Sequence, residues 1–144
     1  MAGTGHLEAL RAACTRYLAK AGLKYFTDTD GDYLLMFDDG VRVLVMPREL
    51  KDGVTVVKVE ALCVKGMRID GDLGIFLAEE NAKSLFGKLA LYPDRQEIHY
   101  EHALLGDYLN QAELELAVQL VAYSTGQYDD RIKERWGGKK GGEL

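Results

Sequence analysis

The residues of this chain that could bind a metal ion begin with an acidic run at positions 28–32. Asp28, Asp30 and Asp32 alternate along the run, and Asp39 follows at the distance of the last ligand of a calcium loop. Such a loop needs a glycine at its sixth position and a helix on each side. Tyr33 stands at the sixth position, and the flanking residues have the pattern of strands. The pattern therefore favours an acidic hairpin turn over a calcium site.

Histidines offer a second kind of metal ligand. His99 and His102 are three residues apart in a predicted strand, so they point to opposite faces and cannot easily chelate one ion. His6 lies near the chain end, and no pair of cysteines or histidines has the spacing of a zinc site. The sequence therefore predicts no metal and no cofactor.

The side chains that could act in catalysis are also better explained by structural roles. Cys14 and Cys63 each lie among apolar neighbours, where a thiol packs as a small hydrophobe, so neither a disulfide nor a nucleophile is expected. The adjacent pairs Glu79-Glu80 and Asp129-Asp130 lie on predicted helices, where neighbours diverge by about 100° and cannot act as a facing acid and base. The glycines form no phosphate-binding pattern. We therefore expect that the protein is not an enzyme.

Composition limits the remaining classes. The chain has 144 residues, enough for one domain with its own core. Its net charge is −5 and its basic residues are scattered among acids, which argues against binding to nucleic acid. No apolar run reaches the roughly 20 residues needed to span a bilayer, and residues 1–6 lack the features of a signal peptide. We therefore expect no membrane insertion and a cytoplasmic location.

The elements that would position these side chains can be read from the hydrophobic pattern. Helical spacing from Leu7 to Ala21 predicts a first helix that stops at Gly22. A second helix is predicted over about 70–85, and a third begins at the Asn110 cap with Glu113 as its partner. Gly126 is expected either to kink this helix or to end it. Strand patterns cover residues 24–29, 33–37, 41–46, 54–65, 87–92 and 97–103.

This order predicts an α+β fold: a helix, an antiparallel three-strand meander, a helix, a β-hairpin and a long C-terminal helix packed on one face of the sheet. The domain is expected to span residues 1–138. Residues 139–144 are rich in Gly and Lys and are expected to form a flexible tail.

Alternation within the meander indicates which strand face is covered. Val41, Val43 and Val45, like Val57 and Val59, would lie under a helix. The opposite face is more apolar than a solvated face needs, which predicts a partner-binding surface. Its predicted residues are Leu34, Met36, Leu44, Met46, Val56 and Leu62. The alternative is a parity error of one residue, which would place all six in the core.

Three segments resemble the YbjN-type family, which is described as bacterial sensory transduction regulators and whose fold is similar to that of type III secretion chaperones. They are Leu73 to Asn81, Gly87-Lys88-Leu89-Ala90-Leu91, and Tyr123 through Asp129-Asp130-Arg131-Ile132 to Trp136-Gly137-Gly138. The resemblance covers most of the chain, and the Gly-Lys tail and the apolar outer strands depart from it. It implies an α+β domain that works by binding, often as a dimer, with no catalytic residues.

Two functional hypotheses follow. The first is a non-enzymatic protein-binding module, a chaperone-like or regulatory adaptor in bacterial signalling, whose partner is another protein and which can form a homodimer. The second is a small-molecule sensor with a pocket between the sheet and the C-terminal helix, near Tyr100, Tyr128 and Trp136.

Overall fold

The computed structural model describes residues 2–144, with side chains from residue 5 onward. Met1, the first residue of the predicted domain and of the segment tested for a signal peptide, lies outside the described residues. The elements in chain order are α1 (Ala2–Lys20), β1 (Phe26–Thr27), β2 (Tyr33–Met36), β3 (Arg42–Glu49), η1 (Lys51–Gly53), β4 (Thr55–Lys65), α2 (Gly71–Lys83), β5 (Lys88–Tyr92), β6 (Glu97–Leu105), α3 (Gln111–Trp136), β7 (Lys139–Lys140) and η2 (Gly141–Glu143).

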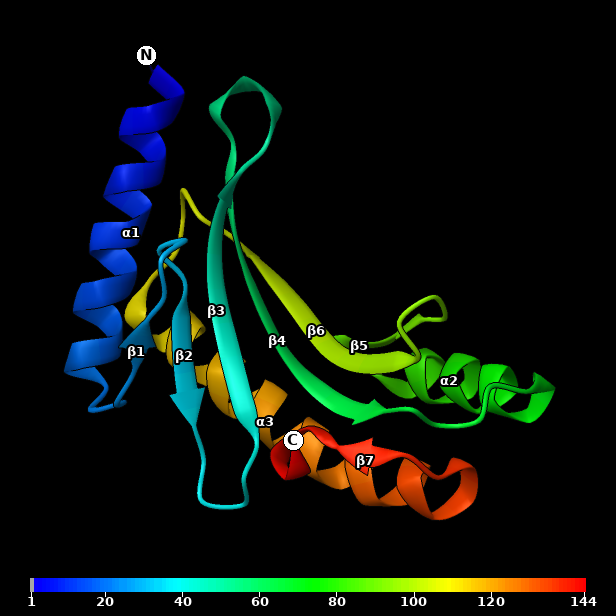
Figure 1. The fold of residues 1–144 in the computed structure, drawn as a ribbon. Coiled ribbons are helices and arrows are strands. Elements are labelled where there is room, and N and C mark those ends of the chain that lie inside the picture. Colours follow the sequence, from blue (N-terminus) through cyan, green and yellow to red (C-terminus); the bar gives the residue numbers. More distant parts are fainter. Residues whose placement is uncertain (1) are drawn as a thin grey trace.

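The strands form one antiparallel sheet with the order β1-β2-β3-β4-β6-β5 (Figure 1). Strands β2, β3 and β4 are the predicted meander. The later hairpin joins the meander through β6, because β6 pairs with β4 along most of its length, and β5 is left at the sheet edge. The predicted α+β fold is confirmed.

One face of this sheet is the core, and we call it the inner face. Val43, Val45, Val57 and Val59 have no exposed surface, and Val45 pairs directly with Val59. Helices α1 and α3 cover these valines with their own buried stripes, which are Leu10, Cys14 and Leu18 from α1 and Leu114, Val118, Val121 and Ile132 from α3. In Figure 1, α3 passes behind β3 and β4, and no helix lies in front of these two strands.

Helix α3 begins at the predicted cap, and it does not end at Gly126. The side-chain oxygen of Asn110 accepts from the backbone amide of Glu113 at 2.9 Å. The helix continues through Gly126 to Trp136 and ends before Gly137, whose φ of 77° is a left-handed conformation that suits glycine. The uninterrupted helix reaches from α1 to α2 and covers the full width of the core.

The segment 139–144 has a defined place in the structure. Lys139 and Lys140 pair with Lys65 and Val64 of β4 as strand β7. The flexibility expected of residues 139–144 stays a prediction. Glycines make this approach feasible, since a Cβ on Gly141 would lie 2.2 Å from the carbonyl oxygen of Leu62. Ion pairs from Lys140 to Asp130 and from Lys133 to Glu143 hold the segment against α3.

No helix of residues 2–144 combines the length and the apolar character that crossing a bilayer requires.

Candidate functional site

The candidate site is the sheet face opposite the core, which we call the outer face. The six residues predicted to bind a partner all lie on it, and none is fully buried. Met36 is the most open, with 55% of its surface exposed. The six residues predicted to point away from the core do so in the structure. A parity error of one residue, which would have placed them in the core, is therefore excluded. Partner binding at these residues stays a prediction.

The structure brings four of the six residues together. Leu34 and Leu44 are paired directly across β2 and β3. Met36 lies next to Leu34 along β2 and Met46 lies next to Leu44 along β3, on opposite sides of the pair because the strands are antiparallel. We call Leu34, Met36, Leu44 and Met46 the apolar band. Val56 and Leu62 lie toward opposite ends of β4, separated by Lys58 and Glu60. These two residues flank the apolar band and are not part of it.

A further apolar residue of the outer face was missed by the sequence analysis. Leu105, which is 59% exposed, pairs with Val56 across β4 and β6. Beside this pair, a hollow of about 360 Å³ is lined by Lys58, Lys88, Glu101 and Ala103 among others. Leu105 could not be placed from the sequence, because its neighbours depend on the register between β4 and a strand more than 30 residues away.

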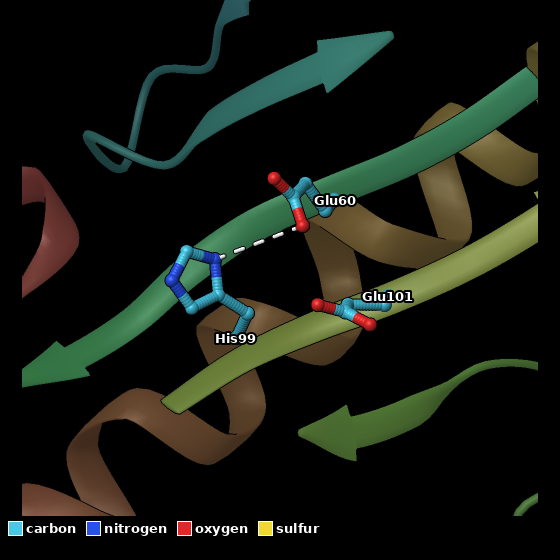
Figure 2. Close-up of side chains that lie close together, drawn as sticks. All are labelled: Glu60, His99 and Glu101. Atoms are coloured by element: carbon cyan, nitrogen blue, oxygen red, sulfur yellow. Dashed lines mark ion pairs between the residues drawn. The ribbon is translucent and has the colours of Figure 1, made fainter. Parts of the chain in front are cut away.

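The polar half of the outer face contains a group that the sequence analysis also missed. Glu60 of β4 pairs with Glu101 of β6, and His99 lies two residues before Glu101 on the same face. Figure 2 shows the imidazole and the two carboxylates facing one another between the strands. Nδ1 of His99 is 3.9 Å from a carboxylate oxygen of Glu60. We call Glu60, His99 and Glu101 the His-Glu cluster.

Charged neighbours surround the His-Glu cluster. Nζ of Lys58 lies 3.5 Å from Glu60 and 3.4 Å from Glu101. Burial alone raises the pKa of Glu101, but the hydroxyl of Tyr92 donates to this carboxylate and Lys58 lies beside it, and together they hold its pKa below the ordinary value. The carboxylate of Glu101 is therefore ionised at neutral pH.

The acidic turn at residues 28–32 is a different kind of cluster. Oδ1 of Asp28 accepts from the backbone amides of Asp30 and Asp32 at 2.9 and 3.0 Å, which is an Asx turn. The buried carboxylate of Asp32 accepts two hydrogen bonds from Arg48, at 2.6 and 2.8 Å. The turn uses the carboxylate of Asp28 and Arg48 uses that of Asp32, in agreement with the interpretation as a hairpin turn.

Only two of the three residues predicted near a small-molecule pocket line the same hollow in the structure. Tyr100 and Tyr128 stack with ring centroids 6.0 Å apart and line a hollow of about 380 Å³ between α2, α3 and the sheet. Burial and the neighbouring Glu80 raise the pKa of Tyr128 to about 12. Trp136 does not line this hollow: it is buried and donates from Nε1 to Asp70 at 3.0 Å.

The two cysteines lie in the core. Burial raises the pKa of both Cys14 and Cys63 to about 12, so neither is a thiolate at neutral pH. Their sulfur atoms serve packing, as the apolar sequence context predicts.

Comparisons with known proteins agree with this architecture. Residues 8–142 match the family TY-Chap1, described as "T3SS (YopN, CesT) and YbjN peptide-binding chaperone 1". No curated protein sequence matches the chain.

Three solved structures have a similar fold. A chain of the ExsC–ExsE complex superposes with a TM-score of 0.66 at 15% identity, over 87% of this chain and 94% of that one. The Yersinia pestis type III secretion chaperone SycH, in complex with a fragment of YscM2, gives 0.61 at 13% identity, over 82% and 98%. YbjN of E. coli gives 0.56 at 17%, over 85% and 91%.

Proposed function

Since the chain belongs to the TY-Chap1 family of peptide-binding chaperones, we propose that it binds an extended segment of another protein on its outer sheet face. The apolar band on β2 and β3 is the central contact in this proposal, with Val56 and Leu62 at its flanks. The observation that carries the proposal is a set of four adjacent apolar side chains on a face that no helix of residues 2–144 covers. Exposed apolar surface of this kind commonly marks an interaction site.

The edge of β2 offers main-chain contacts beside the band. Strand β1 pairs only with Tyr33 and Leu34, so no strand of the described chain pairs with Leu35 and Met36 on that side. An extended peptide can add to such an edge through backbone hydrogen bonds while its side chains contact the neighbouring surface. Affinity would come from the backbone and from burial of the apolar band, which stabilises by roughly 1 kcal/mol for each half-exposed side chain that becomes covered.

The methionines provide a direct test. Met36 and Met46 belong to the band, whereas Met67 is fully buried in the core. A partner segment identified by affinity capture and mass spectrometry would be synthesised and titrated into protein labelled with ¹³C at the methionine methyl groups. We expect the Met36 and Met46 signals to shift and the Met67 signal to stay. Shifts confined to other parts of the molecule would contradict the proposed site.

A matched pair of variants tests the same contact by affinity. Leu44→Glu places a charge in the apolar band, and we expect it to weaken peptide binding by more than about tenfold. Leu50→Glu is the control, because Leu50 is an exposed leucine outside the band, at the start of the β3–β4 connection. Equal affinities of the two variants would overturn the assignment of the band as the binding site.

The finer features of the role are part of the same proposal. We propose a non-enzymatic regulatory adaptor in bacterial signalling that acts in the cytoplasm and forms a homodimer. Membership in a family of peptide-binding chaperones supports a binding role over a catalytic one. Light scattering on the purified protein would measure its mass, and a monomer at micromolar concentration would remove the homodimer from the proposal.

The second candidate function is a small-molecule sensor. It is favoured by the hollow beside Tyr100 and Tyr128, whose size falls within the usual range for ligand pockets. A thermal-shift screen with metabolites would show a saturable rise in melting temperature if this function is correct. Tyr128→Leu should abolish that rise, while Tyr108→Leu, a change at an exposed tyrosine away from the hollow, should not.

A further inference from the structure

We propose that the His-Glu cluster is a binding site for a divalent transition-metal ion of the zinc type, with Nδ1 of His99 and the carboxylates of Glu60 and Glu101 as ligands. This site does not depend on the proposed peptide binding, since all three ligands come from the chain itself. One ring nitrogen of His99 and one carboxylate oxygen from each glutamate lie within 4.8 Å of one another on two adjacent strands, and Nδ1 itself is 3.9 Å from Glu60.

The ring of His99 is held by Glu97. Its Nε2 donates to a carboxylate oxygen of Glu97 at 2.8 Å. A carboxylate only accepts, so Nε2 carries a proton and Nδ1 is the ring nitrogen left to offer a lone pair to a metal ion. A carboxylate behind a histidine, which fixes its tautomer and ring orientation, is the usual support for a metal-binding imidazole.

Nδ1 of His99 has no hydrogen-bond partner among the described residues. It is buried and makes no hydrogen bond, and its nearest acidic oxygen, on Glu60, is 3.9 Å away, too far for a hydrogen bond. A buried polar atom without a partner is costly, and a bound ion would remove that cost. Zinc bonds of about 2.0–2.2 Å at a tetrahedral angle place ligand atoms about 3.3–3.5 Å apart. Small rotations of Glu60 and His99 would reach that spacing.

Lys58 is the present counterion of the two carboxylates. Its ammonium lies 3.4 and 3.5 Å from Glu101 and Glu60, longer than the 2.7–2.9 Å of a strong charged hydrogen bond. The Lys58 side chain is 39% exposed and long enough to move into solvent, whereas the Glu101 side chain is only 5% exposed. A divalent ion could therefore replace the ammonium and neutralise both carboxylates at shorter distance.

The ligand set favours one class of ion. One imidazole nitrogen and two carboxylate oxygens suit Zn²⁺ and similar first-row ions, whereas Ca²⁺ and Mg²⁺ prefer all-oxygen sites with more ligands. Three protein ligands also leave one tetrahedral position open, on the same face as the apolar band.

Zinc alone is the probe for the test. Protein treated with a chelator would be titrated with Zn²⁺ by calorimetry, and the ring nitrogens of His99 would be followed by NMR. We expect one ion per chain and a large shift of the Nδ1 signal of His99. His99→Gln and Glu60→Gln should each weaken binding by more than about tenfold. His102→Gln is the matched control, because His102 lies on the inner side of β6 and should bind zinc like the wild type.

Lys58→Met is a second test, which does not depend on the folding of the variants that change a metal ligand. Removing the competing ammonium should tighten zinc binding by about tenfold, whereas a merely structural lysine would leave it unchanged. The proposal fails if the wild type does not bind zinc at one equivalent, if His99→Gln binds as tightly as the wild type, or if Lys58→Met does not tighten binding.

Discussion

The inner and outer faces of the sheet are made from alternate residues of the same strands, yet they are completed in different ways. On β3, Val43 and Val45 point inward and are fully buried under the helices. Leu44 and Met46 point outward and remain partly exposed. The inner face is closed by the helices, whereas no helix of residues 2–144 covers the outer face, which carries the partly exposed apolar band and the His-Glu cluster.

This difference separates stability from binding. A side chain on the inner face contributes through packing that is already complete, so its loss leaves a cavity. A side chain on the outer face has little packing to lose, and its contribution appears when a partner or an ion is bound. Variants of neighbouring residues can therefore test the two roles separately.

The largest effect is expected from truncation on the inner face. Val45→Ala should lower the free energy of unfolding by about 2 kcal/mol, because it creates a cavity beside Val59. Leu44→Ala, one residue away on the outer face, should cost less than about 1 kcal/mol. Urea unfolding followed by the fluorescence of Trp136, the only tryptophan, measures both values. Equal losses would show that the outer face is packed as well as the inner one.

A smaller effect is expected from Arg48, a charged residue of the outer face that forms an ion pair with the buried carboxylate of Asp32. Arg48→Met leaves the carboxylate of Asp32 buried without its partner, and it should lower the free energy of unfolding by about 1–2 kcal/mol. The expected loss is smaller than for a fully buried ion pair, because the Arg48 side chain is 46% exposed and solvent screens its charge. Arg42→Met on the same strand should cost less, since Arg42 donates only to the carbonyl oxygen of Leu144. A calcium-induced rise in the melting temperature would contradict the assignment of residues 28–32 as an arginine-paired turn.

The C-terminal segment offers a test at the boundary of the sheet. A Cβ on Gly141 would collide with the backbone of Leu62, so Gly141→Ala should detach residues 139–144 and cost up to about 1 kcal/mol. A Cβ on Gly74 in α2 meets nothing within 4 Å, so Gly74→Ala should stabilise slightly. Hydrogen exchange of residues 139–144 reports the detachment. Fast exchange already in the wild type would support the flexible tail expected from the sequence.

The smallest effects are expected from pH, with opposite signs on the two sides of the sheet. The hydrogen bond from His99 lowers the pKa of Glu97 on the outer face, so its contribution is present at neutral pH and is lost as the pH falls below about 4.5. Burial raises the pKa of Asp129 on α3, so this carboxylate destabilises the fold at neutral pH, and that cost is relieved as the pH falls.

Urea unfolding at pH 7 and at acidic pH checks these signs. At pH 7, Glu97→Gln should lower the free energy of unfolding and Asp129→Asn should raise it. At acidic pH both differences should shrink. Changes of the same sign at pH 7 would contradict the contrast between the two faces.

Local features of the fold were predictable from the sequence. The cap of α3 depends on Asn110 and Glu113, three residues apart, and it forms as predicted. The inward and outward positions of β3 and β4 follow from a period of two, which identified all six outer residues correctly. The helix does not end at Gly126, which was one of the two outcomes expected there, because the packing of α3 on the sheet outweighs the low helix propensity of one glycine.

The polar half of the outer face was not predictable in the same way. The spacing of His99 and His102 predicted opposite faces of the strand, and the structure places them so. The partner of His99 is Glu60, almost 40 residues earlier, and the two meet through the register between β4 and β6. No local pattern reports that register. The pairing of Asp32 with Arg48 likewise depends on how β2 and β3 are aligned.

The sequence by itself determined the elements, their order, the caps and the face to which each strand residue belongs, because these depend on backbone preferences and periodicity over a few residues. Only the tertiary structure decided which outer residues are neighbours, that β7 lies beside β4, and that His99 faces two carboxylates. The physical reason is that strand register and glycine-mediated backbone contacts are settled by the whole core at once, over separations that local propensity does not reach.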